Sequence, residues 1–222
     1  MDHKLCVSKV PIFSELEYEK LKQINKLAKH RTYSKKEIIF MEGQLAQNIH
    51  IINSGQVKIF NTSKEGKEYI IRLLGEGDFF GELILFKDEN LTYSAKAVTE
   101  VELCLLNKND LEKLLEDNPP IARQLLAALS SRLKTIEDKA YSLALDNAKD
   151  KTKKLLIRLA KENGDKKETG IEIHLPLTRA GLASLMGMKQ ETMSRKLSEL
   201  EKDGKIEIIG RKKILLKDKL FD

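Results

Sequence analysis

The sequence predicts an α+β protein with three successive parts: a β-rich N-terminal domain, a long helix, and a C-terminal domain built around two short helices. Three observations support this prediction. Short β-rich runs divided by glycines fill residues 31–106, apolar residues recur at alternating spacings of four and three over residues 122–143, and residues 178–200 have the pattern of two helices joined at a glycine. The expected domains are residues 1–117, 118–146 and 147–222.

The composition is that of an ordinary folded soluble protein. Of the 222 residues, 41% are hydrophobic and 33% are charged, and no apolar run approaches the ~18 residues of a membrane span. The first residues, MDHKLCVSKVPIF, lack the apolar centre of a signal peptide. We therefore expect a cytoplasmic protein with no membrane partner.

The N-terminal part begins with a predicted helix. Ser14 and Glu17 have the spacing of a capping box, and the helix is expected to end near Lys29. The apolar side of this helix consists of Leu16, Leu21, Ile24, Leu27 and Ala28.

The β-rich runs that follow are divided by regularly spaced glycines. Gly43, Gly55, Gly66 and Gly77 follow one another at distances of 12, 11 and 11 residues. This is the spacing of strands that turn back on one another, so it predicts an antiparallel barrel or sandwich.

A short helix and then a long helix are expected after the β-rich part. The short helix begins at Asn109 or Asp110, and Pro119 restarts the chain for the long helix. The spacing of apolar residues along the long helix is typical of a coiled-coil seam and predicts a homodimer, whereas packing of this helix on its own domain is the alternative. The seam comprises Ala122, Leu126, Leu129, Leu133, Ile136, Ala140 and Leu143.

The C-terminal part contains two predicted helices that meet at a tight turn. Thr178 is expected to cap the first helix, Gly187 to close it, and Gly204 to end the second. The apolar side of the second helix consists of Met193, Leu197 and Leu200. The opposite side presents groups that can bind base edges in a DNA major groove, namely Glu191, Ser194, Arg195 and Ser198. A solvated face with an ion pair between Glu191 and Arg195 is the alternative.

Positive charge is concentrated in the last third of the chain. Residues 147–222 contain 19 Lys and Arg against 12 Asp and Glu, or +7, which leaves 21 against 22, or −1, for residues 1–146. A cation excess beside a polar helix face favours binding to DNA phosphates.

A polar loop at residues 164–170, a strand at IEIHL and a two-stranded wing around Gly210 and Arg211 complete this part. The expected DNA contacts are Thr178, Arg179, Lys189, Gln190, Glu191, Thr192, Ser194, Arg195 and Ser198.

The order of these elements and three motifs resemble the Crp/Fnr family of transcriptional regulators. The motifs are SGQVKIF, GKEYIIRLLGEGDFFGEL and TRAGLASLMGMKQETMSRKL, and the resemblance covers nearly the whole chain. It implies an N-terminal double-stranded β-helix of the cyclic-nucleotide-binding jelly-roll type, a dimerisation helix and a C-terminal winged helix-turn-helix. It also implies contact with RNA polymerase. No nucleophile elbow, HExxH, phosphate loop or paired-carboxylate motif is present, so the sequence indicates a regulator and not an enzyme.

The second helix of the C-terminal pair resembles the recognition helix of the Fnr branch. It reads ETMSR, which matches the E-x-x-S-R pattern of that branch. The resemblance implies that Glu191, Ser194 and Arg195 read TTGA-type half-sites arranged as an inverted repeat. Activation or repression then depends on where such a site lies in a promoter.

The FGEL motif places Glu82 where nucleotide-binding members of the family hold a ribose. In those members an Arg-Ser pair further along holds the cyclic phosphate, but here Thr92 and Tyr93 precede Ser94 and no arginine is present. A phosphate without its guanidinium partner loses a charge-assisted hydrogen bond, which argues against cyclic AMP. Glu82 is then expected to be a structural turn residue. Any effector pocket is expected to involve Gly81, Glu82, Leu83, Tyr93 and Ser94.

No metal or other cofactor is expected. The four-cysteine iron–sulfur cluster of Fnr-type sensors is excluded within one chain, because the sequence has only two cysteines, Cys6 and Cys104. Its four histidines are scattered, which argues against haem. Some cluster-free relatives use a dithiol–disulfide switch, which implies a reversible bond between Cys6 and Cys104; two unrelated thiols are the alternative. A regulator that binds a small molecule other than cyclic AMP, or none, also stays open.

Overall fold

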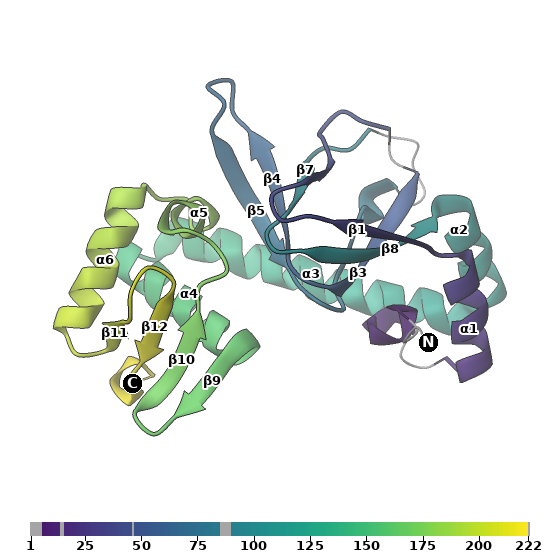
Figure 1. Ribbon diagram of the computed structural model, residues 1–222. Helices are drawn as coiled ribbons and strands as arrows, with labels where there is room; N and C mark the ends of the chain where they lie inside the picture. Colours follow the sequence, from purple (N-terminus) through teal and green to yellow (C-terminus); the bar gives the residue numbers. More distant parts are fainter. Residues whose placement is uncertain (1–5, 14–15, 46, 85–89, 222) are drawn as a thin grey trace. The chain divides into compact units, whose positions relative to one another are not determined.

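The computed structural model describes residues 6–13, 16–45, 47–84 and 90–221. It consists of two compact units, Met1–Thr135 and Ile136–Asp222, which we treat separately (Figure 1). Helix α3, Pro119–Leu145, begins in the N-terminal unit and ends in the C-terminal unit. Among the described residues, no helix is both long enough and apolar enough to cross a membrane.

The N-terminal unit contains two antiparallel sheets of four strands each, with strand orders β1-β8-β3-β6 and β2-β7-β4-β5. The first sheet comprises β1 (Lys29–Tyr33), β8 (Val101–Asn107), β3 (Asn48–Ser54) and β6 (Phe79–Phe80). The second comprises β2 (Ile38–Phe40), β7 (Ser94–Ala97), β4 (Val57–Thr62) and β5 (Glu68–Leu74). The predicted N-terminal β domain is therefore confirmed.

Apolar side chains of both sheets form a shared core, and tight glycine turns connect the strands. The core includes Ile52, Val57, Ile59, Phe80 and Leu103. At the turn between β3 and β4, Gly55 has a φ of +87°, and a Cβ atom there would lie 2.1 Å from the carbonyl oxygen of Glu100. A side chain is excluded at this position, which explains in physical terms why a glycine divides these two β-rich runs.

The other face of the first sheet is covered by helices and by the N-terminal segment. The covering elements are η1 (Cys6–Lys9), η2 (Pro11–Phe13), α1 (Tyr18–Leu27), α2 (Lys108–Asp117) and the start of α3. Their apolar residues pack with this face of the sheet in a second core, which includes Val7, Val10, Phe13, Ile24, Ile51, Cys104, Leu111 and Ile121.

Two predicted helix starts differ from the structure. Helix α1 begins at Tyr18, and its N-cap residue Glu17 makes no side-chain capping hydrogen bond. The expected cap Ser14 lies outside the described residues. Helix α2 begins just before the expected start, because the side chain of Asn107 caps it by accepting a hydrogen bond from the N–H of Asn109 at 3.0 Å.

The predicted seam of α3 is mostly exposed within this chain. Ala122 and Leu129 pack against the N-terminal core. The remaining seam residues are exposed: Leu126, Leu133, Ile136, Ala140 and Leu143. Removal of apolar surface from water is favourable by about 25 cal/mol per Å², so packing of a second helix against these exposed seam residues would be favourable.

The C-terminal unit combines helices with one antiparallel sheet of order β11-β12-β10-β9. Its helices are the end of α3, then α4 (Ala148–Asn163), α5 (Arg179–Leu185) and α6 (Gln190–Lys202). Its strands are β9 (Gly164–Lys167), β10 (Gly170–His174), β11 (Ile206–Ile208) and β12 (Lys213–Leu216), and η4 (Asp218–Leu220) follows. The predicted two-stranded wing corresponds to β11 and β12.

The prediction of a polar loop at residues 164–170 is wrong. Its first residues form strand β9, which pairs with β10 as an antiparallel hairpin. Strand β9 lies at the edge of the sheet, and Asp165, Lys166 and Lys167 are exposed. Charged side chains are common on edge strands because they prevent pairing with other chains. Such a strand lacks the apolar alternation by which strands are recognised in a sequence.

Candidate nucleic-acid interface and sensor site

Helices α5 and α6 meet at a turn that local hydrogen bonds stabilise. The Oγ1 atom of Thr178 accepts a hydrogen bond from the backbone N–H of Gly181 at 3.2 Å and so caps α5. Gly187 has a φ of +62°, and the N–H of Met188 donates to the carbonyl oxygen of Ala183 at 3.0 Å. The predicted helix-turn-helix is present.

Helix α6 has one buried face and one polar face. The buried face consists of Met193, Leu197 and Leu200. On the polar face, Glu191, Arg195 and Ser198 are exposed and Ser194 is half-buried. Within the described part of the chain, Glu191 and Arg195 form no ion pair with each other. Both groups therefore remain available to a partner outside the chain.

The other expected DNA contacts lie at the starts of the same two helices. Lys189 and Gln190 are exposed at the beginning of α6, and Thr192 is half-buried in its first turn. Thr178 is exposed and Arg179 is half-buried at the beginning of α5. These positions place polar and cationic groups beside the polar face of α6.

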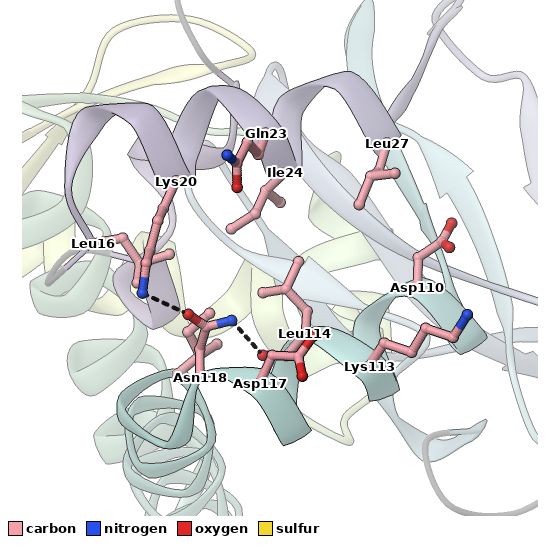
Figure 2. A pocket seen from close by; sticks show the side chains of 11 residues that line it. Leu16, Lys20, Gln23, Ile24, Leu27, Asp110, Lys113, Leu114, Asp117 and Asn118 are labelled. Carbon is pink, nitrogen blue, oxygen red and sulfur yellow. Dashed lines mark hydrogen bonds between the residues drawn. The ribbon is translucent and has the colours of Figure 1, made fainter.

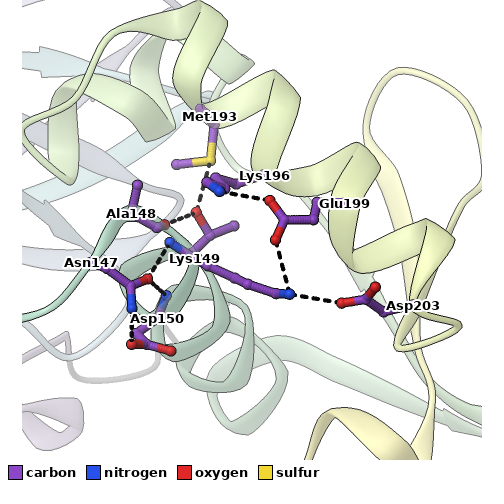
Figure 3. A network of polar contacts seen from close by, with 9 residues as sticks. Asn147, Ala148, Lys149, Asp150, Met193, Lys196, Glu199 and Asp203 are labelled. Atoms are coloured by element: carbon purple, nitrogen blue, oxygen red, sulfur yellow. Dashed lines mark hydrogen bonds and ion pairs between the residues drawn. The ribbon is translucent and has the colours of Figure 1, made fainter.

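A network of ion pairs joins α6 to α4 (Figure 3). The Nζ atom of Lys149 lies 2.9 Å from Oε1 of Glu199 and 2.8 Å from Oδ2 of Asp203, and Lys196 lies 2.6 Å from the other oxygen of Glu199. Hydrogen bonds from Lys196 and Lys149 lower the pKa of Glu199 to about 2, and those to Asp203 and Glu199 raise the pKa of Lys149. Sequence reasoning missed Lys149 because it lies on a different helix, where no local spacing connects it to α6.

The cations of the C-terminal unit differ in whether a carboxylate neutralises them. Lys213 of β12 pairs with Glu172 of β10 at 3.0 Å. Lys189, Arg195 and Arg211 are exposed, and none of them has an ion-pair partner among the residues that the structure describes. These three side chains are available to DNA phosphates or bases.

In the N-terminal unit, the carboxylate of Glu82 is buried and binds two guanidinium groups. Its Oε1 atom lies 3.2 Å from Nη1 of Arg72 and 2.8 Å from Nη1 of Arg132, and the side chains of Glu82, Arg72 and Arg132 are 6%, 17% and 16% exposed. Arg132 lies on α3 and also donates from Nη2 to the carbonyl oxygen of Phe79 at 2.9 Å. Glu82 is therefore more than a turn residue, since it connects β5 and α3 to η3 (Glu82–Ile84).

The other residues of the expected effector pocket lie around this carboxylate or at the surface. The backbone N–H of Gly81 donates to Oη of Tyr93 at 3.0 Å. Burial, followed by the charge of Glu82, raises the pKa of Tyr93. The hydroxyl of Ser94 accepts a hydrogen bond from a backbone N–H at 3.0 Å, and Leu83 is exposed. The N–H of Gly81 and the hydroxyl groups of Tyr93 and Ser94 thus have partners within the chain.

A separate cavity of about 310 Å³ lies between α1 and α2 (Figure 2). Its wall is partly apolar, with Leu16, Ile24 and Leu114, and the Nζ atom of Lys20 donates to Oδ1 of Asn118 at 2.8 Å beside it. None of its lining residues belongs to the expected effector pocket. This cavity is not a continuation of the Glu82 site.

Cys104 lies in β8, is fully buried, and is disulfide-bonded. The sequence contains one other cysteine, Cys6, whose side chain lies outside the described residues. In the ladder between β1 and β8, Cys104 lies opposite His30, and its Sγ atom is 3.5 Å from Nδ1 of that histidine. The sulfur atom of Cys104, which lies in an apolar core, thus contacts the imidazole ring of His30.

The described histidines do not gather into a metal site. Within the described ranges, no group of three His, Cys, Asp or Glu residues is arranged to hold a metal ion. His50 is buried and stacks on Phe80 with ring centroids 4.8 Å apart. Burial, followed by the charge of Arg31, lowers the pKa of His50 to about 4, so this ring is neutral at physiological pH.

Comparison with known proteins decides the family. The model for the cyclic nucleotide-binding domain matches residues 30–118, and the model for the Crp-like helix-turn-helix domain matches residues 152–220. The Anaerobic regulatory protein of Bacillus subtilis is 34% identical over 203 residues, which cover 90% of this chain and 83% of that protein. The chain belongs to the Crp/Fnr family of transcriptional regulators.

Other Crp/Fnr relatives agree in fold and in overall length. A CRP-like cAMP-activated global transcriptional regulator of Mycobacterium tuberculosis is 28% identical over 212 residues, or 96% of this chain and 94% of that protein. The structure of the c-di-GMP responsive global regulator CLP of Xanthomonas campestris has a TM-score of 0.79 at 25% identity and covers 90% of this chain and 99% of that chain. The protein is thus a DNA-binding transcriptional regulator of a non-enzymatic family, as the sequence predicts. Because the names of these two relatives give two different nucleotides, the family alone does not identify an effector.

Proposed function

We propose that the protein is a homodimeric regulator that reads an inverted repeat of TTGA-type half-sites through Glu191, Ser194 and Arg195. The polar face of α6 carries this proposal, because Glu191 and Arg195 are exposed there while the opposite face is buried. An arginine can donate two hydrogen bonds to guanine, and a glutamate can accept one from the cytosine amino group. We assign Arg195 to the guanine of the half-site.

The exposed seam of α3 supports the homodimer. Leu126, Leu133 and Ile136 are 65%, 57% and 50% exposed, although they continue the apolar repeat of the helix. A second copy of α3 covers this seam in the proposed dimer. Two recognition helices are then related by a twofold axis, which matches half-sites about one DNA turn apart. RNA polymerase is the proposed partner of the DNA-bound dimer.

We further propose that a disulfide between Cys6 and Cys104 controls the regulator. Cys104 is disulfide-bonded and Cys6 is the one other cysteine of the sequence. Val7, which follows Cys6 in η1, is packed in the same apolar core as Cys104. Mass spectrometry under non-reducing conditions after mild peroxide treatment is expected to find one bond between the two cysteines. Two free thiols contradict this part of the proposal.

A regulator with a small-molecule effector other than cyclic AMP is the second candidate function. Two guanidinium groups share one carboxylate at Glu82, so the site carries surplus positive charge and favours an anion. Both guanidinium groups are already paired with Glu82 within the chain, which favours a regulator that needs no effector. DNA binding by the purified protein, with no small molecule added, separates these two cases.

Selection of bound DNA from a random pool, with reduced and with oxidised protein, tests the proposal as a whole. The expected result is enrichment of an inverted TTGA-type repeat to different extents in the two redox states. Enrichment of a single half-site contradicts the homodimer, and an unrelated sequence contradicts the assigned reading residues. Binding must also weaken steeply with added salt, because phosphate contacts release counterions.

A further inference from the structure

We infer that His30 is a positioning residue for the redox chemistry of Cys104, and that its ring stabilises the Cys104 thiolate when the disulfide opens. This inference rests on the disulfide control proposed above and deepens it. Cys104 is then the sulfur that accepts the electron pair of the broken bond, and His30 is the side chain that stabilises it there.

The strand register brings the two side chains together. In the first sheet β8 lies between β1 and β3, and Cys104 lies opposite His30 on one side and Ile51 on the other. Residues directly opposite in antiparallel strands point to the same face of the sheet. Cys104 thus has an apolar neighbour on one strand and an imidazole on the other, with 3.5 Å between Sγ and Nδ1.

Burial differs sharply between the two members of this pair. Cys104 is 0% exposed and belongs to the apolar core under the N-terminal segment, whereas His30 is exposed. Burial in apolar surroundings disfavours a thiolate and makes a cysteine inert, while a neighbouring imidazolium favours the thiolate. His30 therefore places a polar ring beside a buried sulfur and offsets the effect of the core.

The opening of the disulfide follows from this asymmetry. The sulfur of Cys104 is buried, so the thiolate of an external dithiol attacks the other sulfur of the bond. The S–S bond breaks, its electron pair leaves on Cys104, and the resulting thiolate lies against the ring of His30, which stabilises it. The second thiol of the reductant then displaces Cys6. Two electrons pass from the dithiol to the protein, which leaves a cyclic disulfide, the Cys6 thiol and the Cys104 thiolate beside His30. Of the two protons that the dithiol gives up, one goes to Cys6 and the other to solvent.

The test measures reduction of the oxidised full-length protein by dithiothreitol. Mixtures of reduced and oxidised dithiothreitol set the equilibrium, and alkylation followed by mass spectrometry counts the thiols. In the variant His30→Gln, we expect the equilibrium constant for reduction and the initial rate to fall by about threefold to tenfold, because the leaving thiolate loses its cation. The matched control is Arg31→Gln, which removes a charge from the next position of the same strand. Since successive side chains of a strand point to opposite faces, the control is expected to stay within about twofold of the wild type.

The variant His30→Lys separates electrostatic support from packing, because it keeps a cation at the same position. We expect its reduction equilibrium to lie within about threefold of the wild type. Equal values for His30→Gln and the wild type, with the disulfide intact in both, overturn the role of His30 alone. A lysine variant that behaves like the glutamine variant also overturns it. An oxidised wild type with no bond between Cys6 and Cys104 instead removes the proposed disulfide control itself.

Discussion

The recognition helix and the sensor site place their charged groups in opposite environments. On α6, Glu191 and Arg195 are exposed above a buried apolar stripe. In the N-terminal unit, Glu82 is buried against Arg72 and Arg132. An exposed charge costs little to leave unpaired, whereas a buried charge needs a partner to compensate for lost hydration. Exposure therefore keeps the α6 groups available for DNA, and burial commits Glu82 to partners within its own chain.

The largest expected effect of this difference is on stability. The variant Glu82→Gln keeps the shape of the side chain but leaves two mostly buried guanidinium groups without their carboxylate. We expect the free energy of unfolding to fall by about 3–5 kcal/mol, the range for a broken buried ion pair. Urea denaturation of the full chain, followed by circular dichroism, measures this loss.

The matched control for Glu82 is another carboxylate that binds two cations in the same unit. Glu68 pairs with Lys58 and Lys96, but its side chain is 34% exposed. We expect Glu68→Gln to cost less than about 1 kcal/mol, because solvent screens such a pair. Equal losses for Glu68→Gln and Glu82→Gln contradict the distinction between buried and exposed pairs.

The same contrast explains how much could be predicted from the sequence. The two faces of α6 follow from residues three and four positions apart, so the stripe with Met193 and the polar face with Arg195 are readable in one stretch. Glu82 is also visible, through its motif. The partners of Glu82 cannot be identified from the sequence, because Arg72 comes from β5 and Arg132 from α3. Only the folded chain brings the two guanidinium groups to one carboxylate.

Two further features depend on contacts that no local pattern records. Strand β9 is recognisable only by its pairing with β10, since its exposed charges hide the strand period. The contact between His30 and Cys104 depends on the register of β1 with β8. Local sequence therefore predicts helices, turns and faces well, and long-range pairing remains to be supplied by the structure.

A pH titration sharpens the contrast within the N-terminal unit. Burial lowers the pKa of His50 to about 4 from 6.5, so the unfolded chain binds a proton more readily than the folded one. The neutral ring of His50 therefore contributes its full stabilisation above pH 6.5. This stabilisation is lost as the pH falls towards 4, and the total loss is about 3 kcal/mol. The unfolding free energy of the wild type minus that of His50→Leu is therefore expected to decrease by this amount between pH 7 and pH 4. A difference that stays constant over this range contradicts the buried, neutral ring.

On the exposed side of the comparison, Arg195→Ala is expected to weaken binding to the TTGA-type repeat by about 1–3 kcal/mol and to relax the preference at guanine. Gel-shift titration at fixed salt, with the repeat and with a variant changed at guanine, measures both effects. The variant Lys189→Ala is the control, because a phosphate contact should weaken binding to both sequences equally. Unchanged affinity of Arg195→Ala for the repeat rejects the assignment of Arg195 to guanine.

The smallest effect is expected where an exposed ion pair only supports the reading face. Lys149 joins α4 to Glu199 of α6 and to Asp203, the C-cap residue of that helix (Figure 3). We expect Lys149→Met to weaken specific DNA binding by no more than about threefold at low salt, because exposed ion pairs contribute little. The control Lys154→Met removes a lysine of the same helix that pairs with Asp146 instead, and it should leave affinity unchanged.

The partners of Lys149 decide what a deficit in Lys149→Met means. If Lys149 acts only through Glu199 and Asp203, replacing both carboxylates by amides already removes its contribution, and adding Lys149→Met to that background should leave the affinity for DNA unchanged. A direct phosphate contact by Lys149 predicts a different result, the same loss of affinity in both backgrounds and a smaller salt slope. No added loss in the amide background therefore assigns Lys149 to the support of α6, and it leaves the contact with DNA to the exposed residues of the polar face.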